Sequence, residues 1–219
     1  MQYLPCVEIE PENEADAAVI WLHGLGANGH DFEPVVPELH LPEDMAVRFV
    51  FPHAPVRPVT VNNGYVMPAW YDISSLTIDE DRDVEGLMQS AESVRKLVDR
   101  ERDRGIADER IVLAGFSQGG AVAYQVALTC PEKLAGLLAL STYLAVTDTI
   151  RPHPANLDLP IRIYHGKSDP VVPEALGRKS YSMLTEMGYR PEYKTYPMQH
   201  AVCAEEIEDI SGALQEWLR

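Results

Sequence analysis

The stretch between Arg110 and Gln125 constrains the fold more than any other part of the chain. Its apolar run Ile111–Ala114 predicts a short buried strand, and the small and apolar residues of Gln118–Thr129 predict a helix. Between them lies Gly-Phe-Ser-Gln-Gly, a G-x-S-x-G pattern centred on Ser117. Strand, sharp turn and helix in this order are typical of a nucleophile elbow, which projects the serine hydroxyl from the edge of a sheet. The alternative is an ordinary glycine turn in which Ser117 only caps the helix.

Apolar runs alternate with helical patterns along the rest of the chain. This alternation predicts an α/β fold with a mostly parallel central sheet flanked by helices. We expect one domain over residues 1–219 without a large cap domain, because only the short connection Ser141–Leu159 separates two of the strands. Strands are expected at Ala17–Leu22, Val47–Phe51, Ile111–Ala114, Gly136–Leu140, Ile161–Tyr164 and Glu192–Tyr196, and helices at Arg82–Arg104, Gln118–Thr129, Pro173–Met187 and Glu205–Leu218.

Charge and cysteine content narrow the choice of partners. The formal net charge of -16 argues against nucleic acid or an anionic membrane surface as a partner. The three cysteines form no C-x-x-C pair, which favours reduced thiols and a cytoplasmic location. No signal peptide is expected at the N-terminus, and the most apolar stretch, Leu134–Val146, is too short to span a membrane. The sequence leaves open whether two subunits form a homodimer through exposed apolar rims of their pockets.

A glycine-rich turn follows the first expected strand. Gly24–Gly29 fits the G-x-G-x-x-G fingerprint of dinucleotide sites, but the next strand ends in Pro52 and His53 and offers no acid for a ribose. The other interpretation is a turn that supplies a backbone N–H to an oxyanion hole. It nominates the N–H groups of Leu25 and Gln118 as the two donors.

Two further loops at expected strand ends carry an acid and a base. Asp169 follows the strand Ile161–Tyr164, and His200 follows the strand Glu192–Tyr196. A serine hydroxyl needs a base to become a nucleophile, and the base needs an orienting carboxylate. The chain order Ser117, Asp169, His200 is the order found in α/β-hydrolases, so we expect these side chains to form a catalytic triad.

The other histidines give no sign of a metal site. No H-E-x-x-H motif and no His/Cys spacing of a zinc site occurs in the sequence. His23 and His165 flank glycine turns at strand ends, and we expect both to be structural. No metal and no cofactor are therefore expected.

The long segment from Phe51 to Asp72 has no helix or strand period, which is typical of a functional loop. Trp70 is expected either to line a substrate pocket or to anchor the loop in the core. Met67, Leu76 and Val172 are further candidates for the lining of the pocket.

The chain resembles the carboxylesterase/acyl-protein thioesterase (phospholipase/carboxylesterase) family of small α/β-hydrolases, bacterial carboxylesterases included. The matching pieces are W-L-H-G-L-G-A-N-G-H-D-F, F-P-x-A-P-x-R-P-V-T-x-N-x-G, M-P-A-W-Y-D-I, G-F-S-Q-G-G-A-V-A, H-G-K-S-D-P-V-V-P and the M-x-H of M-Q-H-A-V-C. The resemblance implies an α/β-hydrolase fold and a serine carboxylic-ester hydrolase that needs no metal or cofactor. It implies Ser117 as nucleophile, Asp169 as orienter, His200 as base, and Leu25 and Gln118 as oxyanion donors. The family often has M-G-H where this chain has Met-Gln-His.

Several functions stay open at this point. A short chain without a cap and with Pro-rich loops favours a carboxylesterase for small-molecule esters with small to medium acyl chains. The alternative is an acyl-protein thioesterase or lysophospholipase that takes long acyl chains. Two hypotheses from other functional classes are a non-catalytic binding protein with a hydrolase fold and a nicotinamide oxidoreductase that uses Gly24–Gly29.

Overall fold

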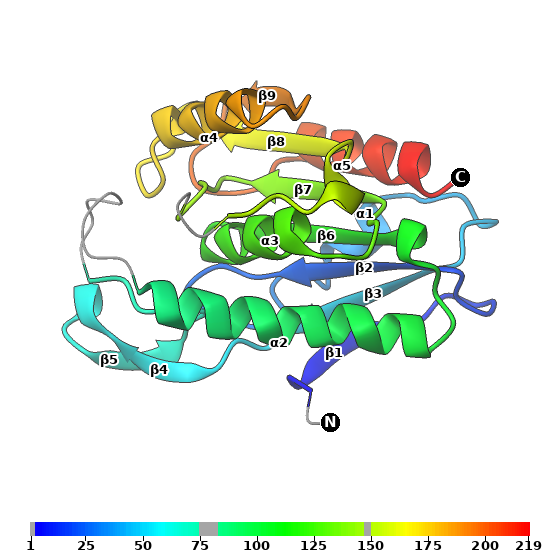
Figure 1. Ribbon diagram of the computed structural model, residues 1–219, viewed down its shortest axis with the longest axis horizontal. Coiled ribbons are helices and arrows are strands. Elements are labelled where there is room, and N and C mark those ends of the chain that lie inside the picture. Colours follow the sequence, from blue (N-terminus) through cyan, green and yellow to red (C-terminus); the bar gives the residue numbers. More distant parts are fainter. Residues whose placement is uncertain (1–2, 75–82, 147–149) are drawn as a thin grey trace.

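The computed structural model describes residues 3–74, 83–146 and 150–219. A seven-stranded sheet runs through the molecule in the order β1-β3-β2-β6-β7-β8-β9 (Figure 1). Only β1 runs antiparallel to its neighbour in this sheet. The strands are β1 (Cys6–Ile9), β2 (Ala17–Leu22), β3 (Val47–Pro52), β6 (Ile111–Phe116), β7 (Gly136–Leu140), β8 (Ile161–Gly166) and β9 (Glu192–Tyr196).

Helices cover both faces of the sheet (Figure 1). The helices are α1 (Val35–Glu38), α2 (Val84–Asp103), α3 (Gln118–Thr129), α4 (Glu174–Glu186) and α5 (Ala204–Trp217). Single 3-10 turns lie at Thr60–Asn62, Asp108–Arg110 and Pro154–Asn156. Among the described residues no helix is long and apolar enough to cross a membrane.

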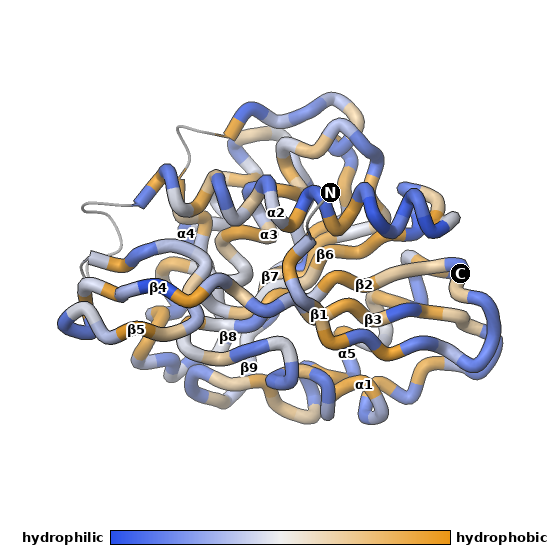
Figure 2. Tube along the Cα trace, turned by 90° about the horizontal axis from the view of Figure 1, so that it is seen from below, coloured by the Kyte–Doolittle hydropathy of each residue, from blue (hydrophilic) through white to orange (hydrophobic). Residues whose placement is uncertain are grey.

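Strand side chains alternate between two hydrophobic cores, one on each face of the sheet. Ala18, Ile20 and Leu22 of β2 pack in the core under α2, α3 and α4, while the intervening Val19 and Trp21 pack in the core under α1 and α5. Each fully buried large apolar side chain contributes about 1.5–3 kcal/mol. Figure 2 shows hydrophobic residues concentrated in the central strands and hydrophilic residues toward the periphery. Because both faces of the strands are buried, they read in the sequence as continuous apolar runs.

The predicted α/β architecture and its mostly parallel sheet are confirmed, and every expected strand and helix is present within a few residues of its predicted bounds. The sequence analysis did not expect the antiparallel edge strand β1, the short helix α1 or the hairpin formed by β4 (Val56–Val59) and β5 (Tyr65–Pro68). The hairpin lies inside the segment predicted as a loop without strands, so that expectation was wrong for these residues. Its outer residues Val56 and Val66 are exposed, which hides the usual alternation of a strand.

The carboxyl ends of the parallel strands face one side of the molecule, toward which the arrowheads of β2, β7 and β8 point in Figure 1. Sites in open α/β sheets form at this edge. All residues that the sequence nominated for catalysis follow strands that end here.

Candidate active site

Ser117 lies between β6 and α3 with a strained backbone. Its φ of 53° and ψ of -122° place it in a region that residues with a side chain rarely adopt. The strain is held by two hydrogen bonds: the Ser117 N–H donates to Leu140 O (2.9 Å), and the Thr142 hydroxyl donates to Ser117 O (2.6 Å). A strained serine at a βα turn has the geometry of a nucleophile elbow.

The glycines of the G-x-S-x-G pattern are required by close backbone packing. A Cβ on Gly115 would lie 2.5 Å from Gly119 O, and a Cβ on Gly119 would lie 2.5 Å from His23 O. Both oxygens belong to the backbone, so neither can move aside as the end of a flexible side chain could. These two positions therefore let α3 start directly against β6 and against the loop after β2.

Asp169 and His200 are joined by a hydrogen bond. His200 Nδ1 lies 2.7 Å from Asp169 Oδ2, and the Asp169 side chain is fully buried. The other carboxylate oxygen, Oδ1, accepts the backbone N–H groups of Val171 (2.8 Å) and Val172 (2.9 Å). These two bonds fix the plane of the carboxylate, so that Oδ2 faces the imidazole.

His200 also lies close to the elbow. Its ring packs against Phe116, the residue before Ser117, with the ring centroids 4.7 Å apart. The hydrogen bonds of the described residues include none between the Ser117 hydroxyl and His200. Hydrogen bonds between a nucleophile and its base often form fully only in the reacting complex.

The buried His165 supports the turn that carries Asp169. Its Nε2 lies 2.8 Å from the backbone carbonyl of Val172 and 3.7 Å from Asp169 Oδ2. Burial lowers the pKa of His165. A neutral imidazole that donates to a backbone carbonyl has the structural role expected from the sequence. His23, the other histidine expected to be structural, is also buried.

The two nominated oxyanion donors come from neighbouring elements. Gln118 is the first residue of α3, and Leu25 lies in the loop after β2. Among the described residues neither backbone N–H has a hydrogen-bond acceptor. The loop approaches the elbow closely, since a Cβ on Gly24 would lie 3.4 Å from the Cβ of Ser117. Both N–H groups are thus free to bind an anionic oxygen.

The candidates for the substrate pocket differ in their placement. Trp70 is fully buried and its indole N–H donates to His23 O (2.8 Å), so it anchors the loop, the second of the two roles that the sequence left open for it. Met67 is half-buried, and its sulfur would lie 3.6 Å from a Cβ on Gly26. Val172 is buried and contacts Asp169 through its backbone. Leu76 lies outside the described residues.

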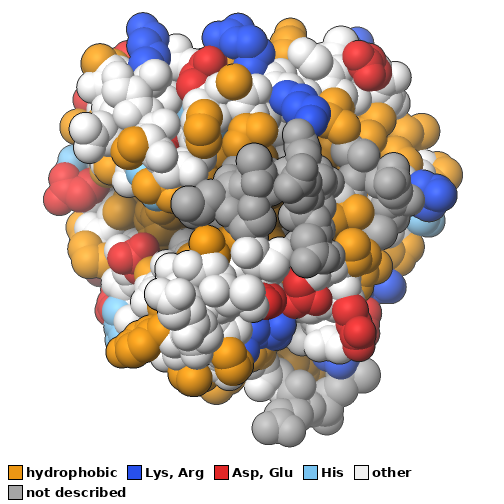
Figure 3. Space-filling view, turned by 90° about the vertical axis from the view of Figure 1, so that its left-hand side faces the viewer, with side chains coloured by type: hydrophobic (Ala, Val, Ile, Leu, Met, Phe, Trp, Pro, Cys, Tyr) orange, Lys and Arg blue, Asp and Glu red, His pale blue; other side chains and the backbone are white. Residues whose placement is uncertain are grey.

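An apolar segment that the sequence analysis considered only as part of the most apolar stretch, Leu134–Val146, begins beside Ser117. Residues 143–146 follow Thr142, which is bonded to Ser117, and all four are less than 10% exposed. The Tyr143 hydroxyl lies 2.8 Å from the Tyr71 hydroxyl. Figure 3 looks at this edge of the sheet and shows apolar side chains exposed between scattered charged groups. The apolar Leu-Ala-Val that follows Tyr143 is the only sequence signal for this segment, and it fits a buried strand equally well.

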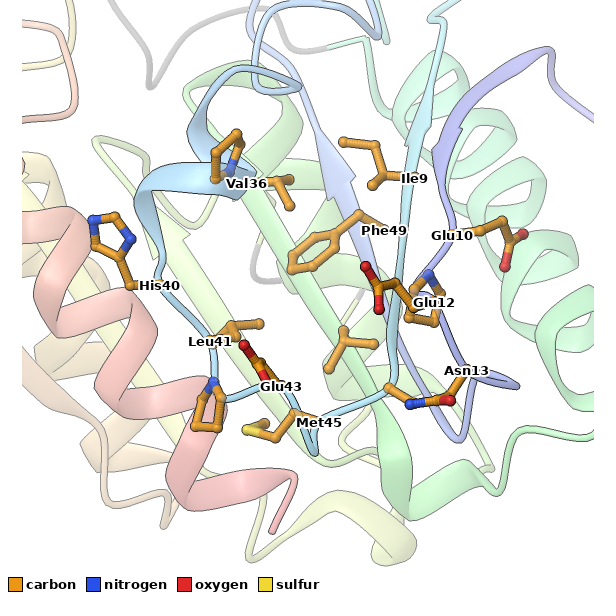
Figure 4. Close-up of a pocket in the computed structure, with 15 residues that line it drawn as sticks. Ile9, Glu10, Glu12, Asn13, Val36, His40, Leu41, Glu43, Met45 and Phe49 are labelled. Atoms are coloured by element: carbon orange, nitrogen blue, oxygen red, sulfur yellow. The ribbon is translucent and has the colours of Figure 1, made fainter.

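A separate hollow lies at the opposite end of the sheet. It has a volume of about 430 Å³ and is lined by residues from the end of β1, the segment after α1 and the start of β3, among them Ile9, Leu41 and Phe49 (Figure 4). None of its described lining residues was nominated by the sequence. The hollow is therefore distinct from the edge that carries Ser117.

Within residues 3–74, 83–146 and 150–219, no group of three His, Cys, Asp or Glu side chains could hold a metal ion.

The sheet is mostly parallel and carries a serine held at positive φ between a strand and a helix. An Asp–His pair lies on the turns after β8 and β9. These features together are typical of hydrolases with the α/β-hydrolase fold. Comparison with known proteins makes the assignment narrower. A family model described as Phospholipase/Carboxylesterase matches residues 5–218. The chain belongs to this family and is a serine ester hydrolase.

Relatives and solved structures agree with this assignment. The chain is 40% identical over 213 residues to acyl-protein thioesterase 1 of Gibberella zeae, covering 92% of this chain and 91% of that protein. It is 38% identical to acyl-protein thioesterase 1 of Cryptococcus neoformans var. neoformans, with 97% of each chain covered. The crystal structure of Arabidopsis thaliana SOBER1 is similar, with a TM-score of 0.88, 29% identity and coverage of 93% and 99%. That of Zea mays acyl-protein thioesterase 2 has a TM-score of 0.87, 28% identity and coverage of 99% and 100%.

Proposed function

We propose that this chain is an acyl-protein thioesterase that hydrolyses thioesters of long acyl chains. The observation that carries the proposal is the 40% identity over nearly the whole length to a protein named acyl-protein thioesterase 1. The sequence by itself favoured a carboxylesterase for small to medium acyl chains, with the thioesterase as the alternative. The comparisons support the alternative better than that first preference.

The apolar segment beside the nucleophile supports a long acyl chain. Residues 143–146 are buried and begin one residue after Thr142, whose hydroxyl is bonded to Ser117 O. The Leu144 N–H is held by the Ser180 hydroxyl of α4 (2.8 Å), so the segment is fixed in place. An alkyl chain that leaves the reacting carbonyl along this segment would be removed from water, which contributes about 0.8 kcal/mol for each buried CH₂.

The catalytic roles that we propose use the residues at this edge of the sheet. The Ser117 hydroxyl attacks the thioester carbonyl carbon while His200 Nε2 takes its proton, and Asp169 holds the opposite ring nitrogen. When the tetrahedral intermediate collapses, the C–S bond breaks and His200 gives the proton to the leaving thiol. Water, deprotonated by His200, then attacks the acyl-enzyme and releases the fatty acid and the Ser117 hydroxyl.

The oxyanion of each tetrahedral intermediate would be bound by the backbone N–H groups of Leu25 and Gln118. Gln118 is at the N-terminus of α3, where the helix dipole also favours negative charge. One such donor is worth about 10²–10³ in kcat.

The experiment that tests this proposal compares wild type with Ser117→Ala. We expect wild type to hydrolyse a palmitoyl thioester and to be labelled once by a long-chain organophosphonate. Ser117→Ala should lose both while it keeps the fold. Labelling of the variant would place the nucleophile elsewhere. A folded wild type that is neither active nor labelled would favour a non-catalytic binding protein.

A carboxylesterase for shorter acyl esters is the second candidate, because the matching family model names carboxylesterases as well as phospholipases. The two candidates share the same residues and the same acyl-enzyme. They differ in the acyl-chain length at which kcat/KM is highest and in whether a thioester or an oxygen ester is the better substrate.

We also infer a cytoplasmic protein. The three cysteines Cys6, Cys130 and Cys203 are unpaired in the structure, which supports a reducing compartment. A homodimer stays a prediction that measurement of the mass in solution would test.

A further inference from the structure

The peptide between Gly24 and Leu25 is oriented by the histidine before it. This peptide carries the Leu25 N–H, which we propose as an oxyanion donor. Its carbonyl oxygen, Gly24 O, lies 2.7 Å from Nδ1 of His23. The C=O and N–H of a trans peptide point in opposite directions. A bond that fixes the carbonyl therefore also fixes the direction of the Leu25 N–H.

The tautomer of His23 follows from its other ring nitrogen. The Ala54 N–H donates to His23 Nε2 (3.1 Å), which requires a nitrogen without a proton. The single proton of the neutral ring is then on Nδ1, so Nδ1 is the donor to Gly24 O. His23 is 1% exposed, and burial lowers its pKa. The ring is therefore neutral and keeps this arrangement near neutral pH.

One short segment holds the loop on both sides of Leu25. The indole N–H of Trp70 donates to His23 O (2.8 Å), and the two rings pack with centroids 5.2 Å apart. Two residues earlier in the same segment, Pro68 O accepts the Gly26 N–H (2.9 Å). The position of the loop thus depends on the position of residues 68–70.

The side chain of Gln118 holds that segment in turn. Its Oε1 accepts the Trp70 N–H (2.9 Å), and its Nε2 donates to Tyr71 O (2.7 Å). The Ser90 hydroxyl of α2 donates to Trp70 O. The side chains of Trp70, Gln118 and Ser90 are all nearly inaccessible to solvent, so water cannot replace these bonds at low cost.

We propose that Trp70 and His23 are positioning residues that set the Leu25 N–H relative to the Gln118 N–H. The connection runs from the Gln118 side chain through Trp70 and His23 to the Gly24–Leu25 peptide. This inference rests on the proposed function, in which both N–H groups bind one oxyanion. Donors that are fixed before the reaction stabilise the transition state without reorganisation, and a misplacement of about 1 Å can cost about 10² in rate.

The test is Trp70→Phe, which keeps an aromatic ring and removes the bond to His23 O. For a long-chain thioester we expect kcat to fall about 10- to 100-fold, with KM changed less than about threefold. The Ki of an alkyl trifluoromethyl ketone, which forms an oxyanion with a serine, should rise by the same factor by which kcat/KM falls. The Ki of the free fatty acid, which forms no tetrahedral adduct, should stay unchanged.

A matched pair of serine variants separates positioning from loss of stability. Ser90→Ala removes the hydroxyl bonded to Trp70 O, and Ser211→Ala removes a buried hydroxyl that donates to Leu39 O far from the loop. Ser90→Ala loses this one buried hydrogen bond, whereas Ser211→Ala also loses the bond that its hydroxyl accepts from Gln215 Nε2 (3.0 Å). Each lost bond costs about 0.5–1.5 kcal/mol, so the control loses at least as much stability as Ser90→Ala. Only Ser90→Ala should lower kcat and raise the Ki of the ketone, by about three- to tenfold.

Two results would overturn the inference. One is a folded Trp70→Phe whose kcat lies within about threefold of wild type; the other is a fatty-acid Ki that rises together with the ketone Ki. If Trp70→Phe does not fold, equal kcat values for Ser90→Ala and Ser211→Ala overturn it. An inactive, unlabelled wild type would refute the proposed function instead, whereas a labelled and active wild type with unaffected variants refutes only this inference.

Discussion

His200 Nδ1 lies 2.7 Å from Asp169 Oδ2, on a carboxylate whose other oxygen is already occupied by two backbone N–H groups. This arrangement leaves one carboxylate oxygen, Oδ2, for the imidazole. The imidazole of His200 is thereby oriented by the turn after β8 rather than by a flexible side chain. Because the acid is fully buried, it needs the imidazole and the backbone donors to replace the water that it has lost.

The first prediction concerns Asp169→Asn. Asparagine can keep the two backbone bonds through its carbonyl oxygen, but its NH₂ group then faces His200 Nδ1. The imidazole must turn into an acceptor at Nδ1 and carries its proton on Nε2, where it cannot act as a base. We expect kcat to fall about 10⁴-fold with the fold retained.

The control for this variant is Asp158→Asn, because the Asp158 side chain is 91% exposed. Steady-state kinetics and thermal melts of both variants provide the measurement. An Asp169→Asn enzyme with kcat within tenfold of wild type would assign the orienting role to another carboxylate.

The second prediction concerns the glycines of the elbow. A Cβ on Gly119 would lie 2.5 Å from His23 O and 2.6 Å from Leu22 O, both backbone atoms that cannot move freely. Gly119→Ala should therefore shift α3 away from β2, destabilise the protein by about 1–3 kcal/mol and lower kcat by about 10² or more.

Gly212→Ala is the matched control. Gly212 lies in α5, and a Cβ there would meet no atom within 4 Å. Alanine in this helix should stabilise the protein by about 0.5–1 kcal/mol and leave kcat unchanged. Urea denaturation of both variants checks the pair. The packing argument fails if Gly119→Ala is as stable and active as Gly212→Ala.

The third prediction concerns the pH dependence of stability. Glu206 lies in the first turn of α5, is fully buried, and its carboxylate oxygens have no hydrogen-bond partner among the described residues. Burial raises the pKa of Glu206 to about 8. The unfolded chain loses this proton near pH 4.5, whereas the folded protein keeps it up to about pH 8. Folding stability is therefore lost as the pH rises across this window, by at most about 5 kcal/mol.

Glu206→Gln removes that proton equilibrium. The unfolding free energy of the variant minus that of wild type should increase from pH 5 to pH 8, because only wild type loses stability in this range. Glu205→Gln, which removes an exposed carboxylate from the same turn of α5, is the control for the loss of a charge at this end of the helix. A constant difference for Glu206→Gln would mean that this carboxyl is ionised in the folded protein.

The sequence predicts the parallel sheet well because its strands are buried on both faces. Apolar runs such as Ala17–Leu22 and Gly136–Leu140 coincide with β2 and β7 at both ends. The same reasoning places Ser117, Asp169 and His200 at one edge, since the carboxyl ends of parallel strands meet there. Of the contacts expected among these three residues, the structure contains the hydrogen bond between Asp169 and His200.

Other features depend on contacts that no local pattern encodes. The hairpin β4–β5 has exposed apolar residues on its outer side, so it lacks the alternation that identifies a strand. The burial of Trp70 is set by bonds to His23 and Gln118, which lie 47 and 48 residues away in the chain. The support of Asp169 by backbone N–H groups depends on the turn geometry of Val171 and Val172.

The central claim is that this chain hydrolyses thioesters of long acyl chains. The most direct measurement is kcat/KM for a matched series of esters and thioesters from acetyl to palmitoyl, with Ser117→Ala as the blank. We expect kcat/KM to rise with acyl-chain length and to be highest for long-chain thioesters, because each buried CH₂ strengthens binding in the transition state. A maximum at short-chain esters, with a fall toward palmitoyl, would contradict the claim and identify a carboxylesterase for small substrates.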